Sequence, residues 1–185
     1  MGVVEFMPKS DGKGVALIIG AGDATGGAIA KKFAMKGFKV VITRRKVERL
    51  NRITEEIRSA GGIVHPFGVD ARREEEMVSF VKKVEDEIGE IEVAVYNVGG
   101  NVRFGISETT SRVFFKVWEM CCFGGFLMGR EVSNYMRTRE RGTIIFTGAT
   151  ASDPGGNRYT AIAAGKHGLR PLPQFMAREL SPKGI

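Results

Sequence analysis

The sequence predicts an α/β fold, in which a doubly wound sheet of about five parallel strands carries helices on both faces. Three observations predict it: short apolar runs recur along the chain, segments with helical periodicity separate them, and glycine-rich turns follow several of the runs. Parallel strands that are joined by single helices need right-handed crossovers, which produce open sheets of this kind. We expect the strand order 3-2-1-4-5.

Five apolar segments are the expected strands. The first, at residues 14–19, reads Gly-Val-Ala-Leu-Ile-Ile, which is typical of a strand that is buried on both faces. The pattern recurs in four further segments, which are residues 37–43, 62–67, 91–96 and 142–147.

Apolar residues three or four positions apart predict a helix between each pair of strands. Residues 109–137 predict one long helix of about 40 Å, enough to cross a domain. Pro171 and Pro173 predict a kink or break near Arg170, because proline has no amide hydrogen to donate within a helix.

Length and composition restrict the classes of protein that remain. A chain of 185 residues fits one domain, and we expect residues 1–12 to be an N-terminal extension of a domain at 13–185. The net charge of +7 suggests an acidic partner or simply solvated helix faces. We expect no nucleic-acid partner, because no basic stripe with interleaved aromatic residues is present. We also expect no membrane span, because the apolar run at 15–19 is far shorter than about 20 residues.

The cysteines and histidines argue against a disulfide and a metal site. Cys121 and Cys122 are adjacent and have no other cysteine to pair with, which predicts a reducing, cytoplasmic location. Only two histidines are present, so we expect no metal centre.

A glycine-rich turn between the first strand and the next helix predicts a binding site for a diphosphate. Glycines allow a tight turn and let backbone amides approach the anion, and the helix dipole points at it. A purely structural turn is the alternative. The residues expected to bind are Gly20, Gly22, Asp23, Ala24, Thr25 and Gly26. The predicted fold is therefore a Rossmann-type dinucleotide-binding domain.

Two arginines at the end of the second strand favour NADP(H) over NAD(H) as the cofactor. An acidic residue here would accept hydrogen bonds from a ribose, whereas Arg44 and Arg45 suit a 2′-phosphate. The alternative is that both arginines begin a basic helix face with Lys46 and Arg49.

Several segments in the right order resemble the short-chain dehydrogenase/reductase family, from about residue 13 to the end of the chain. They are the turn and helix at 20–34, Asp70-Ala71 after the third strand, Tyr96-Asn97-Val98-Gly99, Lys166, and Met176–Leu180. The resemblance implies that Asp70 and Ala71 lie near the adenine, that Asn97, Val98 and Gly99 contact the cofactor, and that Lys166 holds ribose hydroxyls. It also implies hydride transfer between NADP(H) and an alcohol or carbonyl.

The chain departs from the family's catalytic pattern. The position of the family's tyrosine is Ile162, that of its serine is Ala149, and that of its long-helix asparagine is Cys121. Ala24 replaces the middle glycine of the turn. Because isoleucine cannot transfer a proton, two interpretations stay open: an oxidoreductase with a relocated acid, and a nucleotide-binding protein without turnover.

Lys166, Tyr159 and Thr150 are the candidate catalytic residues. Tyr159 lies seven residues before Lys166, so the two α-carbons are about 10 Å apart on one helix. A tyrosine in a turn and a lysine chosen for surface charge are the plainer interpretations.

The resemblance also raises the question of partners. The family continues with two more strands beyond residue 185, so we expect a domain that is short at its C-terminal end, with the fifth strand at an unprotected edge. The expected partners are a small alcohol or carbonyl compound and a second copy of the chain, bound through the helices at 109–137 and 159–180.

Overall fold

The computed structural model describes residues 12–100, 102–149 and 157–185. Its single sheet has five parallel strands in the order β3-β2-β1-β4-β5, as predicted. The strands are β1 (Val15–Ile19), β2 (Lys39–Arg44), β3 (Val64–Gly68), β4 (Ile91–Tyr96) and β5 (Thr143–Phe146). Each lies within two residues of the segment that the apolar pattern predicted.

Alternation along the central strand divides the interior into two cores. Val15, Leu17 and Ile19 face one layer of helices, and Ala16 and Ile18 face the other. All five side chains are buried, because a strand at the centre of a sheet with helices on both faces has no solvent side.

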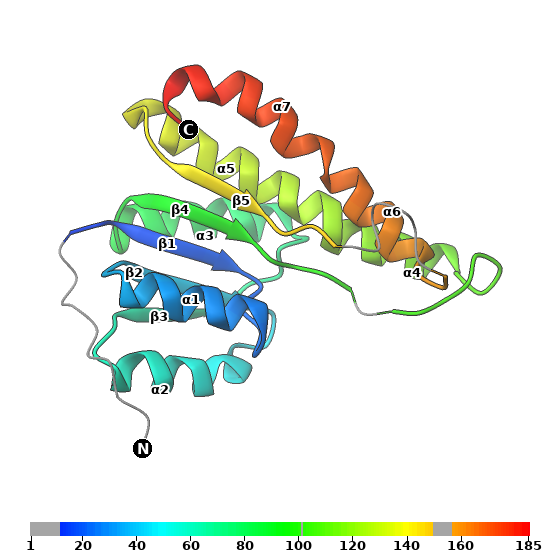
Figure 1. Cartoon of the computed structure of the whole chain (residues 1–185), viewed down its shortest axis with the longest axis horizontal. Helices are drawn as coiled ribbons and strands as arrows, with labels where there is room; N and C mark the ends of the chain where they lie inside the picture. The colour runs from blue at the N-terminus through cyan, green and yellow to red at the C-terminus, as the bar shows by residue number, and fades with distance from the viewer. Residues whose placement is uncertain (1–11, 101, 150–156) are drawn as a thin grey trace.

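Helices cover both faces of the sheet (Figure 1). One face carries α1 (Thr25–Met35), the short 3-10 helix η1 (Val47–Leu50) and α2 (Asn51–Ser59). The other carries α3 (Glu74–Glu87) and α5 (Gly124–Arg139). This is the doubly wound arrangement, in which the carboxyl ends of the strands meet at one edge.

The long helix predicted at 109–137 is observed as an unbroken helical run from Ser111 to Arg139. It comprises α4 (Ser111–Trp118), a π-helical turn η2 (Glu119–Phe123) and α5. The pattern of apolar residues did not predict the π turn. Such turns often mark functional segments, because they leave a carbonyl without its usual partner in the helix.

The chain leaves the sheet through α6 (Thr160–Leu169), α7 (Pro171–Leu180) and the 3-10 turn η4 (Ser181–Lys183). The break predicted near Arg170 is present between α6 and α7, although Arg170 keeps helical dihedral angles. Pro171 begins α7, where its missing amide hydrogen costs no helical bond.

β5 forms one edge of the sheet, and Thr143 and Ile145 on it are exposed. Within the described ranges, no helix has the length and apolar character needed to cross a membrane.

Candidate functional site

The glycine-rich turn begins where β1 ends, and its geometry requires glycine. Gly20 has a φ of +89°, and its amide and that of Ala21 donate to the Thr43 carbonyl at the end of β2. A Cβ at Gly20 would lie 2.7 Å from the Asn97 carbonyl oxygen, and one at Gly26 would lie 2.5 Å from the Gly20 oxygen. The turn is therefore closed tightly against the ends of β2 and β4.

The outer side of the same turn is open. A Cβ at Gly22 would meet no described atom within 4 Å, and Gly22 lines the cavity described below. Ala24 is the N-cap residue that precedes α1, and it makes no side-chain capping hydrogen bond. The Gly27 amide donates to the Gly22 carbonyl at 2.7 Å, so the amides of Thr25 and Gly26 remain for an external acceptor, and a diphosphate fits this arrangement.

Asn97 anchors the turn to β4. Its backbone amide donates to the Ile19 carbonyl at 2.8 Å, and its side-chain Nδ2 donates to the Gly20 carbonyl at 3.0 Å. The residue after the fourth strand thus holds the loop that follows the first strand.

A cavity of about 730 Å³ opens at the carboxyl ends of β1, β2, β3 and β4. The predicted cofactor-binding residues that line it are Gly20, Gly22, Arg44, Arg45, Asp70, Ala71, Asn97, Val98 and Gly99. Asp23, Ala24, Thr25 and Gly26 follow Gly22 at the start of α1 without being part of this lining. The volume is in the range of small-molecule sites.

One end of the cavity is strongly basic. The described basic side chains that line it are those of Arg44, Arg45, Lys46, Arg49 and Arg72. The carboxylate of Asp23, in the glycine-rich turn, lies 3.8 Å from Arg44 and 3.3 Å from Arg52, so it offsets part of this charge.

Asp70 lines the cavity with its carboxylate held by Arg72. Arg72 Nε donates to Oδ1 at 2.8 Å, and Nη2 donates to Oδ2 at 2.5 Å. Mainly because of these bonds, the pKa of Asp70 lies below its ordinary value. Sequence reasoning found Asp70 but missed Arg72, which the Asp-x-Arg spacing after a strand could have signalled.

Lys166 lies beside the cavity rather than on the surface. Its side chain is buried, and Nζ donates to the Val98 and Thr147 carbonyls, each at 2.8 Å. Burial lowers the pKa of this ammonium group. Lys166 thus joins the loops that follow β4 and β5. One of the three N–H donors of its ammonium group remains for another acceptor.

The residues at the family's tyrosine and asparagine positions lie in one buried apolar cluster here. Ile162 and Cys121 belong to one buried cluster with Val117 and Ala161. Burial raises the pKa of the Cys121 thiol. A Cβ on Gly165 would lie 2.8 Å from Cys121 Cβ, so α6 and the π turn are in close contact here.

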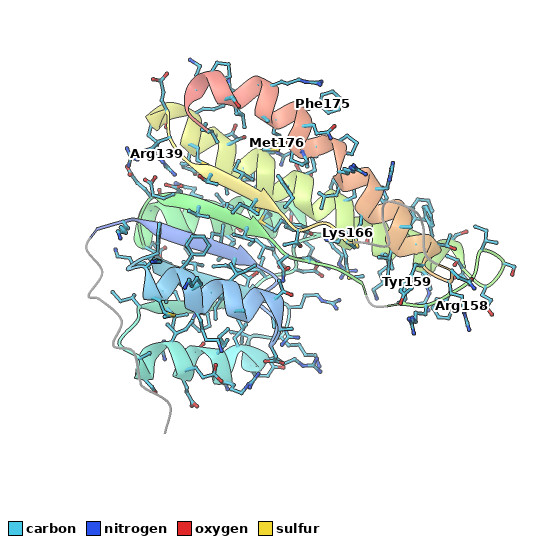
Figure 2. The ribbon with its side chains drawn as sticks, viewed as in Figure 1. Arg139, Arg158, Tyr159, Lys166, Phe175 and Met176 are labelled. Atoms are coloured by element: carbon cyan, nitrogen blue, oxygen red, sulfur yellow. The ribbon has the colours of Figure 1, made fainter. Side chains whose placement is uncertain are left out.

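Tyr159 precedes α6 and is not among the residues that line the cavity. Its hydroxyl accepts a hydrogen bond of 2.6 Å from Arg103 Nε, and the Arg103 guanidinium lies 5.0 Å from the ring centre. Figure 2 shows Tyr159 near the outer end of α6 and Lys166 further along it, toward the sheet. The two residues are seven positions apart in the sequence, which corresponds to about two helical turns. Thr150 lies outside the described residues.

Two further residues shape the site and were missed from the sequence. Tyr96 is fully buried at the end of β4, and its hydroxyl donates to the Met120 carbonyl in the π turn at 2.6 Å. Met120 itself lines the cavity. The adjacent pair Gly124-Gly125 in a long helix was the available signal, because a Cβ on Gly124 would collide with the Tyr96 hydroxyl.

Comparison with known proteins is consistent with this geometry. A family model described as short chain dehydrogenase matches residues 14–185. A short-chain dehydrogenase/reductase of Armillaria gallica is 30% identical over 174 residues, which are 92% of this chain and 67% of that protein. The chain spans 59 to 67% of the length of the first three curated relatives.

Solved structures show the same fold. A short-chain dehydrogenase from Rhodopseudomonas palustris has a TM-score of 0.88 and 48% identity, covering 92% of this chain and 80% of that one. A metagenomic short-chain oxidoreductase in complex with NADP has a TM-score of 0.87 and 28% identity, covering 91% and 77%.

These similarities extend over nearly the whole chain. They agree with the glycine turn, with the strand order and with the cavity at the carboxyl ends of the strands. The chain therefore belongs to the short-chain dehydrogenase/reductase family.

Proposed function

We propose that residues 13–185 are the dinucleotide-binding domain of an oxidoreductase that transfers hydride between NADP(H) and an alcohol or carbonyl compound. The observation that carries the proposal is a single cavity that is lined both by the open glycine turn and by the basic side chains after β2. The nicotinamide supplies the hydride chemistry when bound, and the chain supplies binding and orientation.

NADP(H) is preferred over NAD(H) in this proposal because of charge. Arg45, Lys46 and Arg49 line the cavity and form no ion pair within the described part of the chain. A 2′-phosphate would give these cations an acceptor, whereas a ribose hydroxyl would leave them unpaired. The NADP complex of the metagenomic relative supports this assignment.

The proposed roles follow the cavity from one end to the other. The turn from Gly20 to Gly26 holds the diphosphate, Asp70 and Ala71 border the base, and Asn97, Val98 and Gly99 border the nicotinamide. Lys166 directs its remaining N–H at ribose hydroxyls. Tyr159 and Thr150 are the proposed sources of the relocated proton donor.

Fluorescence titration with NADPH and NADH tests cofactor binding. NADPH should bind roughly tenfold more tightly, the gain expected from one or two charge-assisted hydrogen bonds. Arg45→Met should reduce this preference, and the matched variant Arg112→Met on the exposed start of α4 should leave it unchanged. Failure to bind either nucleotide would contradict the proposal.

A second candidate function is nucleotide binding without turnover. The burial of Ile162 in an apolar cluster with Cys121 favours it, because isoleucine at the family's tyrosine position cannot transfer a proton. NADPH oxidation measured over a panel of carbonyl compounds separates the candidates. Turnover by the parent protein supports the oxidoreductase. Binding without turnover, unchanged in the double variant Ile162→Tyr with Ala149→Ser, supports the binding protein.

We further propose a homo-oligomer that forms through the long helix and the α6–α7 pair, in the cytoplasm. Large apolar side chains are exposed on these helices and give the association its surface: Phe115, Trp118, Phe126 and Phe175.

A further inference from the structure

A cationic group lies outside the cavity lining, where the loop after β4 meets the residue that precedes α6. Arg103 Nε donates to the Tyr159 hydroxyl at 2.6 Å, and the Arg103 guanidinium lies 5.0 Å from the centre of the Tyr159 ring. An isolated parallel bridge joins Phe104, the next residue of the loop, to Tyr159. The ring, the hydroxyl and the neighbouring backbone therefore restrict the orientation of this guanidinium, although Arg103 is exposed.

The charge of Arg103 is not neutralised by a neighbouring carboxylate. Within the described ranges Arg103 forms no ion pair, and its two Nη groups have no hydrogen-bond acceptor. Glu108 provides the only carboxylate between positions 102 and 110, and it is paired with Arg158, whose Nη2 lies 3.4 Å from Glu108 Oε2. The two Nη groups of Arg103 therefore offer a planar pair of donors, which is the shape that a carboxylate matches.

This guanidinium lies next to the position at which the family transfers its proton. Val102, the residue before Arg103, packs against the buried cluster that contains Ile162. Tyr159 and Met120 pack against the same cluster, and Met120 also lines the cavity. Tyr159 precedes Ile162 by three residues, which corresponds to about one helical turn. A carbonyl compound that reacts beside Ile162 therefore has Arg103 within reach of its far end.

We propose that the substrate is an oxo acid or the corresponding hydroxy acid, whose carboxylate binds the two Nη groups of Arg103 while Tyr159 positions the guanidinium. This inference rests on the proposed oxidoreductase function and names the substrate class of that site. An arginine that is already stacked and hydrogen-bonded loses less conformational freedom when a carboxylate binds than a mobile surface arginine does. A neutral carbonyl compound would leave both Nη groups to water.

Isothermal titration calorimetry of the protein saturated with NADP⁺ tests the proposal without requiring turnover. The probes are pyruvate and levulinate, two oxo acids of different length, and their uncharged amides, pyruvamide and levulinamide. At least one of the two acids should bind roughly three- to tenfold more tightly than its amide, the gain expected from charge-assisted hydrogen bonds at an exposed site.

Variants test which side chains produce this preference. Arg103→Met should abolish it, and Arg103→Lys should restore part of it, because the charge returns without the planar pair of donors. Tyr159→Phe removes the hydroxyl that holds Nε and should reduce the preference. Arg178→Met, on the exposed last turn of α7, removes an equal charge elsewhere and should leave the preference unchanged. Thermal melting of each variant confirms that it is folded.

The outcomes separate this inference from the proposed function. If neither acid is preferred by the parent protein, or if the preference persists in folded Arg103→Met, the carboxylate site is overturned while NADPH binding stands. An equal loss in Arg178→Met also overturns it, since net charge alone would then produce the preference. A preference that is unchanged in Tyr159→Phe overturns the positioning role of Tyr159. If the parent protein binds no NADPH, the proposed function fails, and this inference fails with it.

Discussion

At the scale of single residues, Lys166 brings a positive charge into a position that is only 5% exposed. Such burial is costly unless the ammonium group finds acceptors, and the Val98 and Thr147 carbonyls provide two. Their positions after β4 and β5 mean that one side chain connects two neighbouring strand ends under α6. Lys166 therefore has a structural role in addition to its proposed role toward the ribose.

Lys166→Met should lower the free energy of unfolding by about 1–3 kcal/mol, because two buried carbonyls lose a charged donor. Urea denaturation measures the change. Lys116→Met, on the exposed face of α4, is the control and should change stability by less than about 0.5 kcal/mol. Equal stability of the two variants would show that the bonds of Lys166 contribute nothing to the fold.

Asp70 should make stability depend on pH on the acid side. Its pKa is lowered in the folded state from an ordinary value of 3.8, mainly by the hydrogen bonds from Arg72. The contribution of Asp70 to the free energy of unfolding is therefore complete above pH 3.8, and it is lost as the pH falls through the lowered pKa. Asp70→Asn should be less stable than the parent protein at neutral pH, and the difference should shrink in acid. Urea denaturation across this range measures it, and a constant difference would be the contrary result.

At the scale of elements, the π turn η2 is held in place by the strand beneath it. The Tyr96 hydroxyl donates to Met120, a residue of that turn, and Gly124 leaves room for the hydroxyl. Burial raises the pKa of Tyr96, so the hydroxyl remains a donor. A side chain at the end of β4 thus positions Met120 at the cavity.

Tyr96→Phe should destabilise the protein by about 1–3 kcal/mol, because a carbonyl of the π turn loses its partner. Trp118, the only tryptophan, lies next to the turn, so its fluorescence should change as well. The control is Tyr135→Phe on α5, which should leave both the stability and the emission close to those of the parent protein. An unchanged emission in Tyr96→Phe would argue against a positioning role for the hydroxyl.

The opposite end of α5 is attached by a buried ion pair. Arg139 donates to both oxygens of Glu85 on α3 at 3.0 Å, and Glu85 also accepts from the Ile91 amide at 3.1 Å. The two side chains are 12% and 6% exposed. The pair joins two helices and β4 at the amino ends of the strands, away from the cavity.

Arg139→Met should cost about 3–5 kcal/mol, because it leaves a buried carboxylate without its partner. Chemical denaturation provides the measurement. Lys82→Met breaks an exposed pair with Asp86 on the same helix α3 and should cost less than about 1 kcal/mol. If the two variants were equally stable, the buried pair would be no more important than a surface one.

At the scale of the whole molecule, the helices farthest from β3 present exposed aromatic side chains. Trp118, Phe123 and Phe126 stack along the long helix, and Arg130 covers the Phe126 ring. Phe175 on α7 is 64% exposed and points away from the molecule (Figure 2). Such a patch is typical of an interface between protein chains.

Light scattering should therefore give a mass above that of one chain. Phe126→Glu with Phe175→Glu should shift it toward the monomer, because two charges would have to be buried at the interface. Val78→Glu, at a similarly exposed apolar position on α3, should leave the mass unchanged. A monomeric parent protein would contradict the proposed association.

Local patterns carried most of the information needed to predict the fold. The five strands, the long helix and the break at Arg170 depend on apolar periodicity and on proline, which act over a few residues. The π turn could not be predicted this way. The contact observed at this turn is a hydrogen bond to Met120 from Tyr96, which lies 24 residues earlier in the chain.

The candidate site also has parts that local sequence patterns predict and parts that they do not. Gly20, Arg44 and Asp70 could be identified because each follows directly after a recognisable strand. The partners that define their chemistry could not: Asp23 pairs with Arg44, and Arg72 covers the carboxylate of Asp70. The placement of Tyr159 against Arg103 likewise depends on a contact over 56 positions.

By itself, the sequence determined that this chain is a doubly wound α/β domain with a glycine turn, because periodicity and turn chemistry are local properties. Only the tertiary structure decided that Lys166 is buried between two strand ends and that Ile162 and Cys121 share one buried cluster. Burial and pairing arise when segments that are distant in the sequence come into contact. The free energy of those contacts therefore cannot be inferred from any short stretch of the chain.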